Sequence, residues 1–564
     1  MAAGENTEPG NTGYHRYETT GENTHYTDVL CSGKVIRCRR VPVRGITLTV
    51  GVFFDGTGNN RANADDLRLA YAHCAGLVGE ERARACAKYE EHAREGAGNA
   101  SWQGGITNIS RLNDLYKSDT ALGEDEMEAQ VKAYVSGIGT ADGKSDSLLG
   151  MGLGLGSSLI RRFEGVVTKT DEALEKIASA LNIFISRNRD KAAIAKVQFD
   201  VFGFSRGAAA ARHFANRVMN QDTAIMAAIE NGLDMSRYHG KPAGEVRFLG
   251  LFDTVAAIGS LLNFYDINGR SNPGVNLELR PSVAQKVFQI SAMHECRYNF
   301  SLNSIAGMWP ELALPGAHSD IGGGYNAGED EISLLTMPDF DVIPESADET
   351  QTAVYRQAEK MRQALFSLPA LKYLMPHGKV ETKMISWPLV NLDKARAFIF
   401  EKKAGAAVFM TRRAVPNDWE KVCMRVMLDA AQDAGVIFRD IDPQNPDTAL
   451  PAELVPLCDK ATAQGRAIRR GAEPEGFTAE EMRTIGRYLH CSANWNIDSD
   501  LSLWVSPSSG EVFLRNHYAP TDDRSFVWPM APGKGWVRTM WRMDDQQQWE
   551  DRARANVDVL DELF

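Results

Sequence analysis

Stretches of apolar residues predict several β-strands in the first half of the chain. Residues 45–54, GITLTVGVFF, form an apolar run of the length of a buried strand. Residues 196–202, KVQFDVF, alternate apolar and polar positions, and residues 245–255, EVRFLGLFDTV, are again mostly apolar. A helix is predicted at 168–190, between the first of these runs and the second. Strands that alternate with helices predict an α/β fold with a mostly parallel central sheet.

The segments between these strands predict further elements of the same fold. Residues 63–95 are rich in Ala, Glu and Arg and are typical of helices. A second helix begins within 104–117, with Thr107 or Asn108 near its N-cap. Residues 131–140, VKAYVSGIGT, predict a strand that ends in glycines.

The chain changes character after residue 335, where an acidic linker at 337–350 precedes mainly helical patterns. Helices are expected near 351–367 and 417–434, and TAEE at 478–481 has the capping-box pattern of a helix that runs to 490. We therefore expect three parts, which are a polar, flexible tail, an α/β domain and a mostly helical C-terminal module: 1–40, 41–335 and 336–564.

Composition and charge narrow the possible partners. The chain has 564 residues and a net charge of −12, which argues against a nucleic-acid partner because phosphate binding needs a basic face. The eight cysteines include no CxxC pair and are read as reduced thiols, although a Cys31–Cys38 disulfide stays open. The N-terminus has no secretory signal pattern, and no run of about 18 apolar residues predicts a membrane span.

The most informative motif is GFSRG at 203–207, which follows the predicted strand at 196–202 and opens into the alanine-rich sequence AAAAR. A strand, a tight turn that holds Ser205, and then a helix form the layout of a nucleophile elbow. The flanking glycines allow the strained turn, and the Arg206 N–H at the helix start can point at an oxyanion. Ser205 is therefore the predicted nucleophile.

The acid that supports such a serine is expected after it in sequence and at the end of a strand. Asp253 fits, because the strand at 245–255 delivers it to the same sheet edge as Ser205. Asp320 is a weaker candidate. Asp200 lies inside the strand before the elbow and is interpreted as structural.

His318 is the predicted base, because it lies in PGAHSDIGGGY, a glycine-flanked loop that can bring an imidazole over the sheet edge. His294, in SAMHECRYNF, is the runner-up, and His213 on the elbow helix is interpreted as a packing or surface residue.

A second oxyanion donor is expected in the early loop FFDGTGNN at 53–60, from the N–H of Gly56 or its neighbours. A purely structural turn is the main alternative. A phosphatase motif would need an Asp where Phe53 stands, and a Walker A motif would need GKS or GKT, so a phosphate or metal role is disfavoured.

The motifs FFDGTGNN, YVSGIGT, GFSRGAAAAR, FDTV and HSDIGGGY occur in this order, and together they resemble an α/β-hydrolase domain family of bacteria and fungi. More narrowly, residues 45–330 resemble the first class of type VI secretion lipase effectors. The resemblance implies that residues 41–335 form an α/β-hydrolase catalytic domain with a Ser205, Asp253 and His318 triad and phospholipase A activity. It also implies that residues 336–564 partly pack back on the hydrolase. No cofactor or metal ion is implied.

The same resemblance implies where the protein works and with what. It implies synthesis in the bacterial cytoplasm, secretion by the type VI system, and action on membrane phospholipid in the periplasm of a target cell. A spike or carrier protein and a cognate immunity protein are the implied partners. Apolar loops, for example 147–160, are candidates for the acyl-chain site, with an ordinary connecting loop as the alternative. A membrane-contacting region somewhere in 335–564 is a further hypothesis.

Two other functions stay open on the sequence alone. One is a soluble serine esterase that acts on small esters with the same triad. The other is a cargo or binding module that has kept a hydrolase fold without catalysis.

Overall fold

The structure is a computed structural model of the whole chain, and it describes residues 26–31, 34–39, 44–65, 104–119, 121–123, 126–138, 140, 165–188, 192–233, 238, 240–256, 274–337, 339–389, 401–495 and 530–543. The loop 147–160 and all but the start of the helices expected at 63–95 lie outside the described residues.

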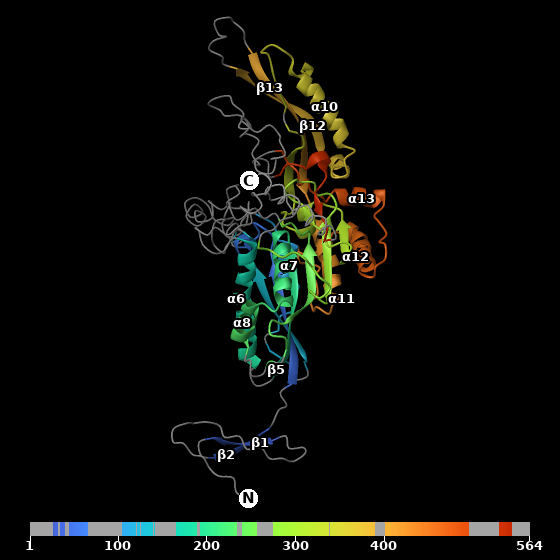
Figure 1. Ribbon diagram of the computed structural model, residues 1–564. Coiled ribbons are helices and arrows are strands. Elements are labelled where there is room, and N and C mark those ends of the chain that lie inside the picture. The colour runs from blue at the N-terminus through green and yellow to red at the C-terminus, as the bar shows by residue number, and fades with distance from the viewer. Residues whose placement is uncertain are drawn as a thin grey trace, which may run out of the picture.

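A parallel sheet of six strands forms the centre of the described structure (Figure 1). Every pair of neighbours in it is parallel. Its strands, in spatial order, are β4 (Glu128–Val135), β3 (Arg44–Phe54), β5 (Ala192–Phe204), β6 (Glu245–Phe252), β7 (Lys286–Ala292) and β9 (Glu311–Leu314). The α/β fold with a mostly parallel sheet is confirmed, and the strands expected at 45–54, 131–140, 196–202 and 245–255 are β3, β4, β5 and β6.

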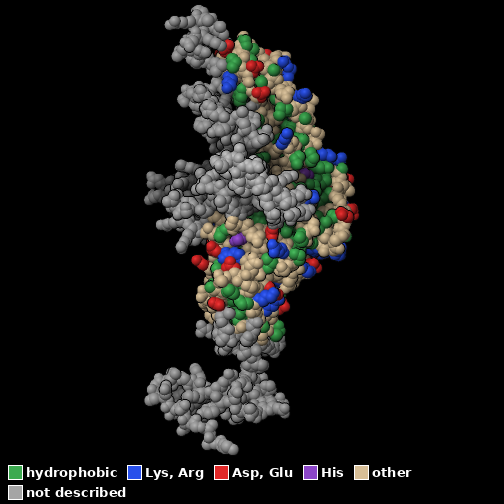
Figure 2. Space-filling model, viewed as in Figure 1, with side chains coloured by type: hydrophobic (Ala, Val, Ile, Leu, Met, Phe, Trp, Pro, Cys, Tyr) green, Lys and Arg blue, Asp and Glu red, His purple; other side chains and the backbone are tan. Residues whose placement is uncertain are grey.

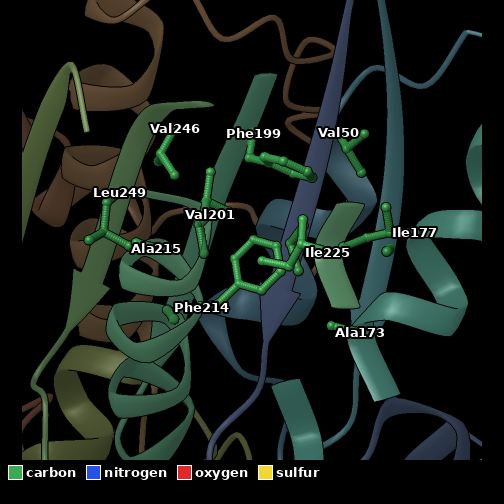
Figure 3. Packing of buried hydrophobic residues seen from close by; sticks show 14 of the residues in the cluster. Val50, Ala173, Ile177, Phe199, Val201, Phe214, Ala215, Ile225, Val246 and Leu249 are labelled. Atoms are coloured by element: carbon green, nitrogen blue, oxygen red, sulfur yellow. The ribbon is translucent and has the colours of Figure 1, made fainter. Parts of the chain in front are cut away.

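Side chains alternate between the two faces of this sheet, as the strand period of two requires. On one face, Val50 of β3 and Phe199 and Val201 of β5 belong to the same buried cluster as Ile177 and Phe214 (Figure 3). The helices that cover this face are α6 (Val166–Asn188), α7 (Arg206–Met219) and α8 (Thr223–Gly232). The helix expected at 168–190 is α6.

The opposite face of the sheet is covered in part by residues from beyond position 336. Phe53 of β3 and Phe202 of β5 stack with a centroid distance of 5.0 Å, and they share a buried cluster with Trp419. Trp419 lies on α11 (Asp418–Asp433), which covers this face together with α4 (Asn108–Leu115). The hydrolase sheet and the C-terminal region therefore share one hydrophobic core.

A second, antiparallel sheet extends away from the hydrolase at the top of Figure 1. Its central strand β13 (Glu401–Val415) pairs with β10 (Glu329–Leu334), β11 (Asp339–Pro344) and β12 (Lys379–Leu389). The sequence predicted helices and a linker here, so this sheet is an addition to the expected architecture.

The expected C-terminal helices are present beside this sheet. They are α10 (Ala353–Leu365), α11 and α13 (Ala479–Gly486), and the structure adds α12 (Val455–Arg469). The capping box is formed, because the Thr478 hydroxyl accepts from the Glu481 N–H and the Glu481 carboxylate accepts from the Thr478 N–H. Thr107 is the N-cap of α4, as expected, and accepts from the Ser110 N–H.

Two short pairings complete the described fold. Within the segment expected to be a flexible tail, β1 (Tyr26–Cys31) and β2 (Lys34–Arg39) pair as an antiparallel hairpin. Near the other end of the chain, β14 (Met540–Trp541) pairs in parallel with β8 (Leu302–Asn303). We call residues 530–543 the strap, because this pairing holds them along 296–304.

The described surface mixes charges of both signs. Figure 2 shows acidic and basic side chains interspersed on the visible face rather than gathered by sign. None of the helices in the described part of the chain combines the length and the apolar character that crossing a bilayer requires.

Candidate functional site

The segment around Ser205 has the geometry of a nucleophile elbow. Strand β5 ends at Phe204, Ser205 has φ 58° and ψ −127°, and α7 begins at Arg206. A positive φ is unfavourable for any residue except glycine, and such strain is concentrated at functional sites. The turn places Ser205 at the carboxyl edge of the sheet, where α/β folds carry their sites.

Glycine at position 207 lets the elbow pack against the early loop. A Cβ at Gly207 would lie 2.3 Å from the Asp55 carbonyl oxygen and 2.4 Å from that of Phe54. Only glycine fits this approach. The contact places the DGTGNN loop beside the start of α7, as an oxyanion loop requires.

Asp253 lies at the end of β6, directly beside the elbow. The Ser205 N–H donates to the Phe252 carbonyl over 3.1 Å, and the Val255 N–H donates to the Ser205 carbonyl over 3.4 Å. Asp253 has a φ of 43°, so two of the three predicted catalytic residues, Ser205 and Asp253, have a positive φ. These bonds fix Ser205 and Asp253 at adjacent strand ends.

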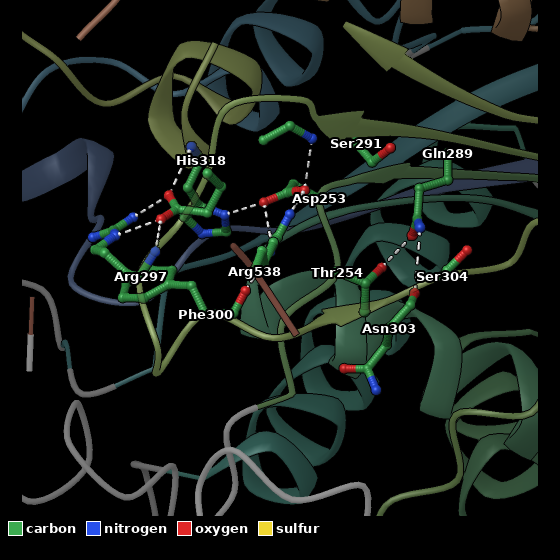
Figure 4. Close-up of polar contacts among 12 residues, drawn as sticks. Asp253, Thr254, Gln289, Ser291, Arg297, Phe300, Asn303, Ser304, His318 and Arg538 are labelled. Atoms are coloured by element: carbon green, nitrogen blue, oxygen red, sulfur yellow. Dashed lines mark hydrogen bonds and ion pairs between the residues drawn. The ribbon is translucent and has the colours of Figure 1, made fainter. Parts of the chain in front are cut away.

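His318 contacts Asp253 directly. His318 opens the short helix α9 (His318–Gly322), and its Nδ1 lies 2.5 Å from Asp253 Oδ2 (Figure 4). The centroid of its ring lies 4.6 Å from that of Phe204, the residue before Ser205, and 5.0 Å from that of Phe300. The structure therefore brings all three predicted residues to one edge of the sheet, although they lie far apart in sequence.

The last contact of a triad is not made here. Among the described residues, no hydrogen bond joins Ser205 to His318. Catalytic hydrogen bonds are often long before substrate binds and tighten in the complex. The Asp253–His318 pair is thus formed in advance.

Charge and burial set the protonation states of this pair. Burial acts to raise the pKa of Asp253, but Arg538 and His318 outweigh it and hold the pKa well below its usual range. Burial lowers the pKa of the His318 imidazole, and the Asp253 carboxylate offsets this only in part. At neutral pH the pair is therefore a carboxylate and a neutral imidazole, the state that a general base needs.

The loop that contains Gly56 is organised by Asp55. The Gly56 N–H donates to Asp55 Oδ1 over 2.7 Å, and the Thr107 hydroxyl donates to the same oxygen over 2.7 Å. The Tyr134 hydroxyl donates to Asp55 Oδ2 over 2.6 Å. Gly56 can serve an oxyanion only if it releases this carboxylate. The first N–H groups of α7, which include that of Arg206, point along the helix axis toward the elbow.

Burial raises the pKa of Asp55 to about 6, from an ordinary value of 3.8, although three hydrogen bonds oppose the shift. The folded state therefore binds the proton more tightly than the unfolded state. The contribution of Asp55 to stability falls as pH rises from 3.8 to about 6 and is constant above that window. The charged carboxylate destabilises the fold by roughly 1–3 kcal/mol at neutral pH.

We expect Asp55→Asn to raise the melting temperature at pH 7, because an amide keeps the acceptor for Gly56 and Thr107 without the buried charge. The gain should shrink at pH 4, where wild-type Asp55 is largely protonated. Thermal unfolding of both proteins at pH 4 and pH 7 measures this difference. A variant that is less stable than wild type at pH 7 would contradict the explanation.

A second ion pair supports His318 from behind, and the sequence analysis did not identify it. Glu295 Oε2 accepts the backbone N–H of His318 over 3.1 Å and the Arg297 guanidinium over 2.8 Å. Arg297 in turn covers the face of the Phe300 ring, 3.3 Å from its centroid. The opposite charges of Glu295 and Arg297, two positions apart in HECRYNF, were the available signal.

Arg538 is the other functional candidate that the sequence did not reveal. It forms two parallel bonds with Asp253, from Nη1 to Oδ1 over 2.7 Å and from Nη2 to Oδ2 over 2.8 Å. No local pattern marks it, because its partner lies 285 positions earlier.

The alternative acid and base candidates have other partners. His294 Nδ1 accepts the Gly316 N–H over 3.1 Å, and burial lowers the pKa of His294 to about 4, so this histidine braces the loop before His318. Asp320 accepts from the Ala317 N–H and pairs with His490 over 2.7 Å. Asp200 pairs with Arg247 and Tyr116.

His213 accepts the Asn276 N–H through its Nδ1, over 3.0 Å. It thus takes part in packing on the elbow helix, away from the Asp253–His318 pair.

The chain is similar to known proteins. Residues 220–339 match the family model "T6SS, Phospholipase effector Tle1-like, catalytic domain". A solved structure described as the Tle1 effector bound to the VgrG spike from the type 6 secretion system is 52% identical, with a TM-score of 0.72. The match covers 94% of this chain and 99% of that one.

A crystal structure of an uncharacterized protein from Pseudomonas aeruginosa matches at 16% identity and a TM-score of 0.31, over 78% of this chain and 52% of that one. No curated protein matches the sequence.

Proposed function

Because this chain belongs to the Tle1-like family of type VI secretion phospholipase effectors, we propose that it hydrolyses acyl esters of membrane phospholipid through a Ser205–His318–Asp253 acyl-enzyme mechanism. The observation that carries the proposal is the Asp253–His318 contact of 2.5 Å beside the strained elbow of Ser205. Such a pair provides a base and an oriented imidazole for a serine nucleophile.

In the first half-reaction His318 Nε2 takes the Ser205 proton while Oγ attacks the ester carbonyl carbon. The carbonyl oxygen becomes an oxyanion, which the N–H of Arg206 stabilises, together with the N–H of Gly56 once this has released the Asp55 carboxylate. Asp253 holds the imidazole in the tautomer that carries its proton on Nδ1 and stabilises the imidazolium. When the intermediate collapses, the proton passes to the leaving lysophospholipid oxygen and the acyl group stays on Ser205.

In the second half-reaction water replaces the leaving alcohol. His318 takes a proton from the water, and the hydroxide attacks the acyl-enzyme carbonyl. Collapse of the second intermediate releases a fatty acid and returns the proton to Ser205.

The decisive experiment identifies the products on a natural substrate. Purified protein is incubated with vesicles of labelled phosphatidylethanolamine and phosphatidylglycerol, and mass spectrometry follows the lipids. Wild type is expected to release free fatty acid and lysophospholipid, and Ser205→Ala is not. Cleavage of short nitrophenyl esters without lipid hydrolysis would favour a soluble esterase. A biological effect that survives in Ser205→Ala would favour a non-catalytic module.

The pH dependence gives an independent test of the base. Since burial lowers the pKa of His318 below 6.5, His318 stays neutral at pH 7. We expect kcat/KM to be flat around neutral pH and to fall about tenfold per pH unit below that pKa. Initial rates on a soluble nitrophenyl ester between pH 4.5 and 8.5 measure the profile. A midpoint above pH 6.5 would contradict the assignment.

We also propose that the protein uses the partners and the route of its family. The 52% identical effector is described bound to a VgrG spike, and the same kind of spike is the proposed carrier. The effector would be made in the cytoplasm, with a cognate immunity protein for protection, and would act on membrane phospholipid in the periplasm of a target cell. Co-purification with the spike protein tests the carrier.

A further inference from the structure

We propose that Arg538 is a positioning residue for the catalytic pair, and that the strap thereby completes the active site. The inference rests on the proposed function, because it assigns a role in the Ser205 mechanism to a residue that does not touch substrate. The strap reaches the site from the far end of the sequence and places a guanidinium on the carboxylate that orients His318 (Figure 4).

The contacts of Arg538 leave Asp253 little freedom. Both Asp253 oxygens accept from Arg538, Oδ1 also accepts the Ala292 N–H over 2.8 Å, and Oδ2 also accepts His318 Nδ1. The Arg538 side chain is 6% exposed and that of Asp253 is 0% exposed. Two parallel charge-assisted bonds fix the plane of a carboxylate as well as its position. That plane sets the direction in which Asp253 presents Oδ2 to the imidazole.

The backbone of the strap holds Arg538 in register with the site. The Leu302 N–H donates to the Thr539 carbonyl over 2.9 Å, directly after Arg538, and Arg538 Nε donates to the Phe300 carbonyl. The Asn303 N–H donates to the Thr254 carbonyl over 2.9 Å, which joins the same segment to the residue after Asp253. The guanidinium is therefore positioned before substrate arrives, as preorganised catalysis requires.

Arg538 also sets the charge around His318. The charged groups bonded to His318 or to its partners are Asp253, Glu295, Arg297 and Arg538, whose charges sum to zero. Of the other charged groups on the neighbouring elements, Asp320 on α9 is paired with His490, Asp200 on β5 is paired with Arg247, and Arg206 opens α7. Without Arg538 the net charge of Asp253, Glu295 and Arg297 would be negative, and an imidazolium would form more readily. The pKa of His318 would then rise.

The test compares three variants on a soluble nitrophenyl ester, so that membrane binding does not enter. Arg538→Gln removes the charge, Arg538→Lys keeps the charge but loses one of the two parallel bonds, and Lys534→Ala is the matched control. Lys534 is an exposed cation on the same strap, four residues from Arg538. For each protein, kcat, KM and the pH profile of kcat/KM are measured, with circular dichroism and thermal unfolding as checks of folding.

We expect Arg538→Gln to lower kcat by about 100-fold with little change in KM, because a displacement of about 1 Å at the base has that effect. The acid limb of its pH profile should move up by about one pH unit. Arg538→Lys should lower kcat by about tenfold and keep the acid limb of wild type. Lys534→Ala should match wild type in all three measurements.

Three results would overturn the inference: Arg538→Gln with wild-type kcat, a reduced kcat whose acid limb has not moved, or Arg538→Lys with wild-type kcat. Wild-type kcat in Arg538→Lys overturns the inference even if Arg538→Gln does not fold. The proposed function and the role of Arg538 can be refuted independently of each other. Hydrolysis that persists in Ser205→Ala overturns the proposed function, whereas an inactive Ser205→Ala with wild-type behaviour in Arg538→Gln overturns only the role of Arg538.

Discussion

Replacing Ser205 by alanine is expected to lower kcat for phospholipid hydrolysis by about 10⁶-fold, the scale of loss when the nucleophile of a serine triad is removed. The side chain is 6% exposed at a turn whose backbone bonds involve its N–H and carbonyl, not its hydroxyl. The fold should therefore keep its melting temperature, and vesicle binding should be unchanged. Fatty-acid release under single-turnover conditions measures the loss directly.

A serine outside the site gives the matched control. Ser333 on β10 is 2% exposed, and it belongs to the antiparallel sheet rather than to the hydrolase sheet. Ser333→Ala should retain wild-type kcat. If Ser205→Ala kept more than a small fraction of activity while Ser333→Ala behaved normally, another residue would have to be the nucleophile.

Asp253→Asn is expected to lower kcat by about 10⁴-fold, since an amide does not hold the imidazole in the required tautomer. The hydrogen bonds around Asp253 add to the effect of this substitution. Both oxygens of Asp253 accept hydrogen bonds from Arg538, so either orientation of an asparagine amide turns its NH₂ toward a donor. Leaving Arg538 without its anionic partner should also destabilise the fold, by about 3 kcal/mol.

A control substitution at Asp200 separates the loss of catalysis in Asp253→Asn from its loss of stability. Asp200 is 0% exposed, as Asp253 is, and it accepts two bonds from one arginine, Arg247, over 2.9 and 2.7 Å. Asp200→Asn should lower the melting temperature in the same direction but keep kcat per folded molecule within a few fold of wild type. Equal losses of kcat in the two variants would mean that Asp253 acts only through stability.

The sequence predicted those parts of the fold and site that depend on local pattern. The elbow could be located because a strand, a glycine-flanked serine and an alanine-rich helix follow one another within about 20 residues. Asp253 could be chosen because parallel strands end at one edge, which the pairing of β5 with β6 now places beside Ser205. The proximity of His318 followed from the order of the motifs, and the structure places it against Asp253.

What the sequence did not predict depends on contacts between distant segments. Arg538 looks like any polar residue of a C-terminal segment, and only the β14–β8 pairing carries it to Asp253. The antiparallel sheet was missed because β13 contains AGAAVFM, whose small residues are as typical of helices and loops as of strands. The hydrogen bond from Gly56 to Asp55 was equally hidden, since it depends on the conformation of one loop.

The position of Arg538 in the chain has a consequence for the cell that makes this protein. A ribosome reaches Arg538 285 residues after Asp253, which at ordinary translation speeds takes on the order of 15 to 60 s. During that interval the nascent chain already contains Ser205, Asp253 and, later, His318, but not the residue that fixes the plane of the acid. Full lipolytic power would then arise only after the ribosome has passed Arg538.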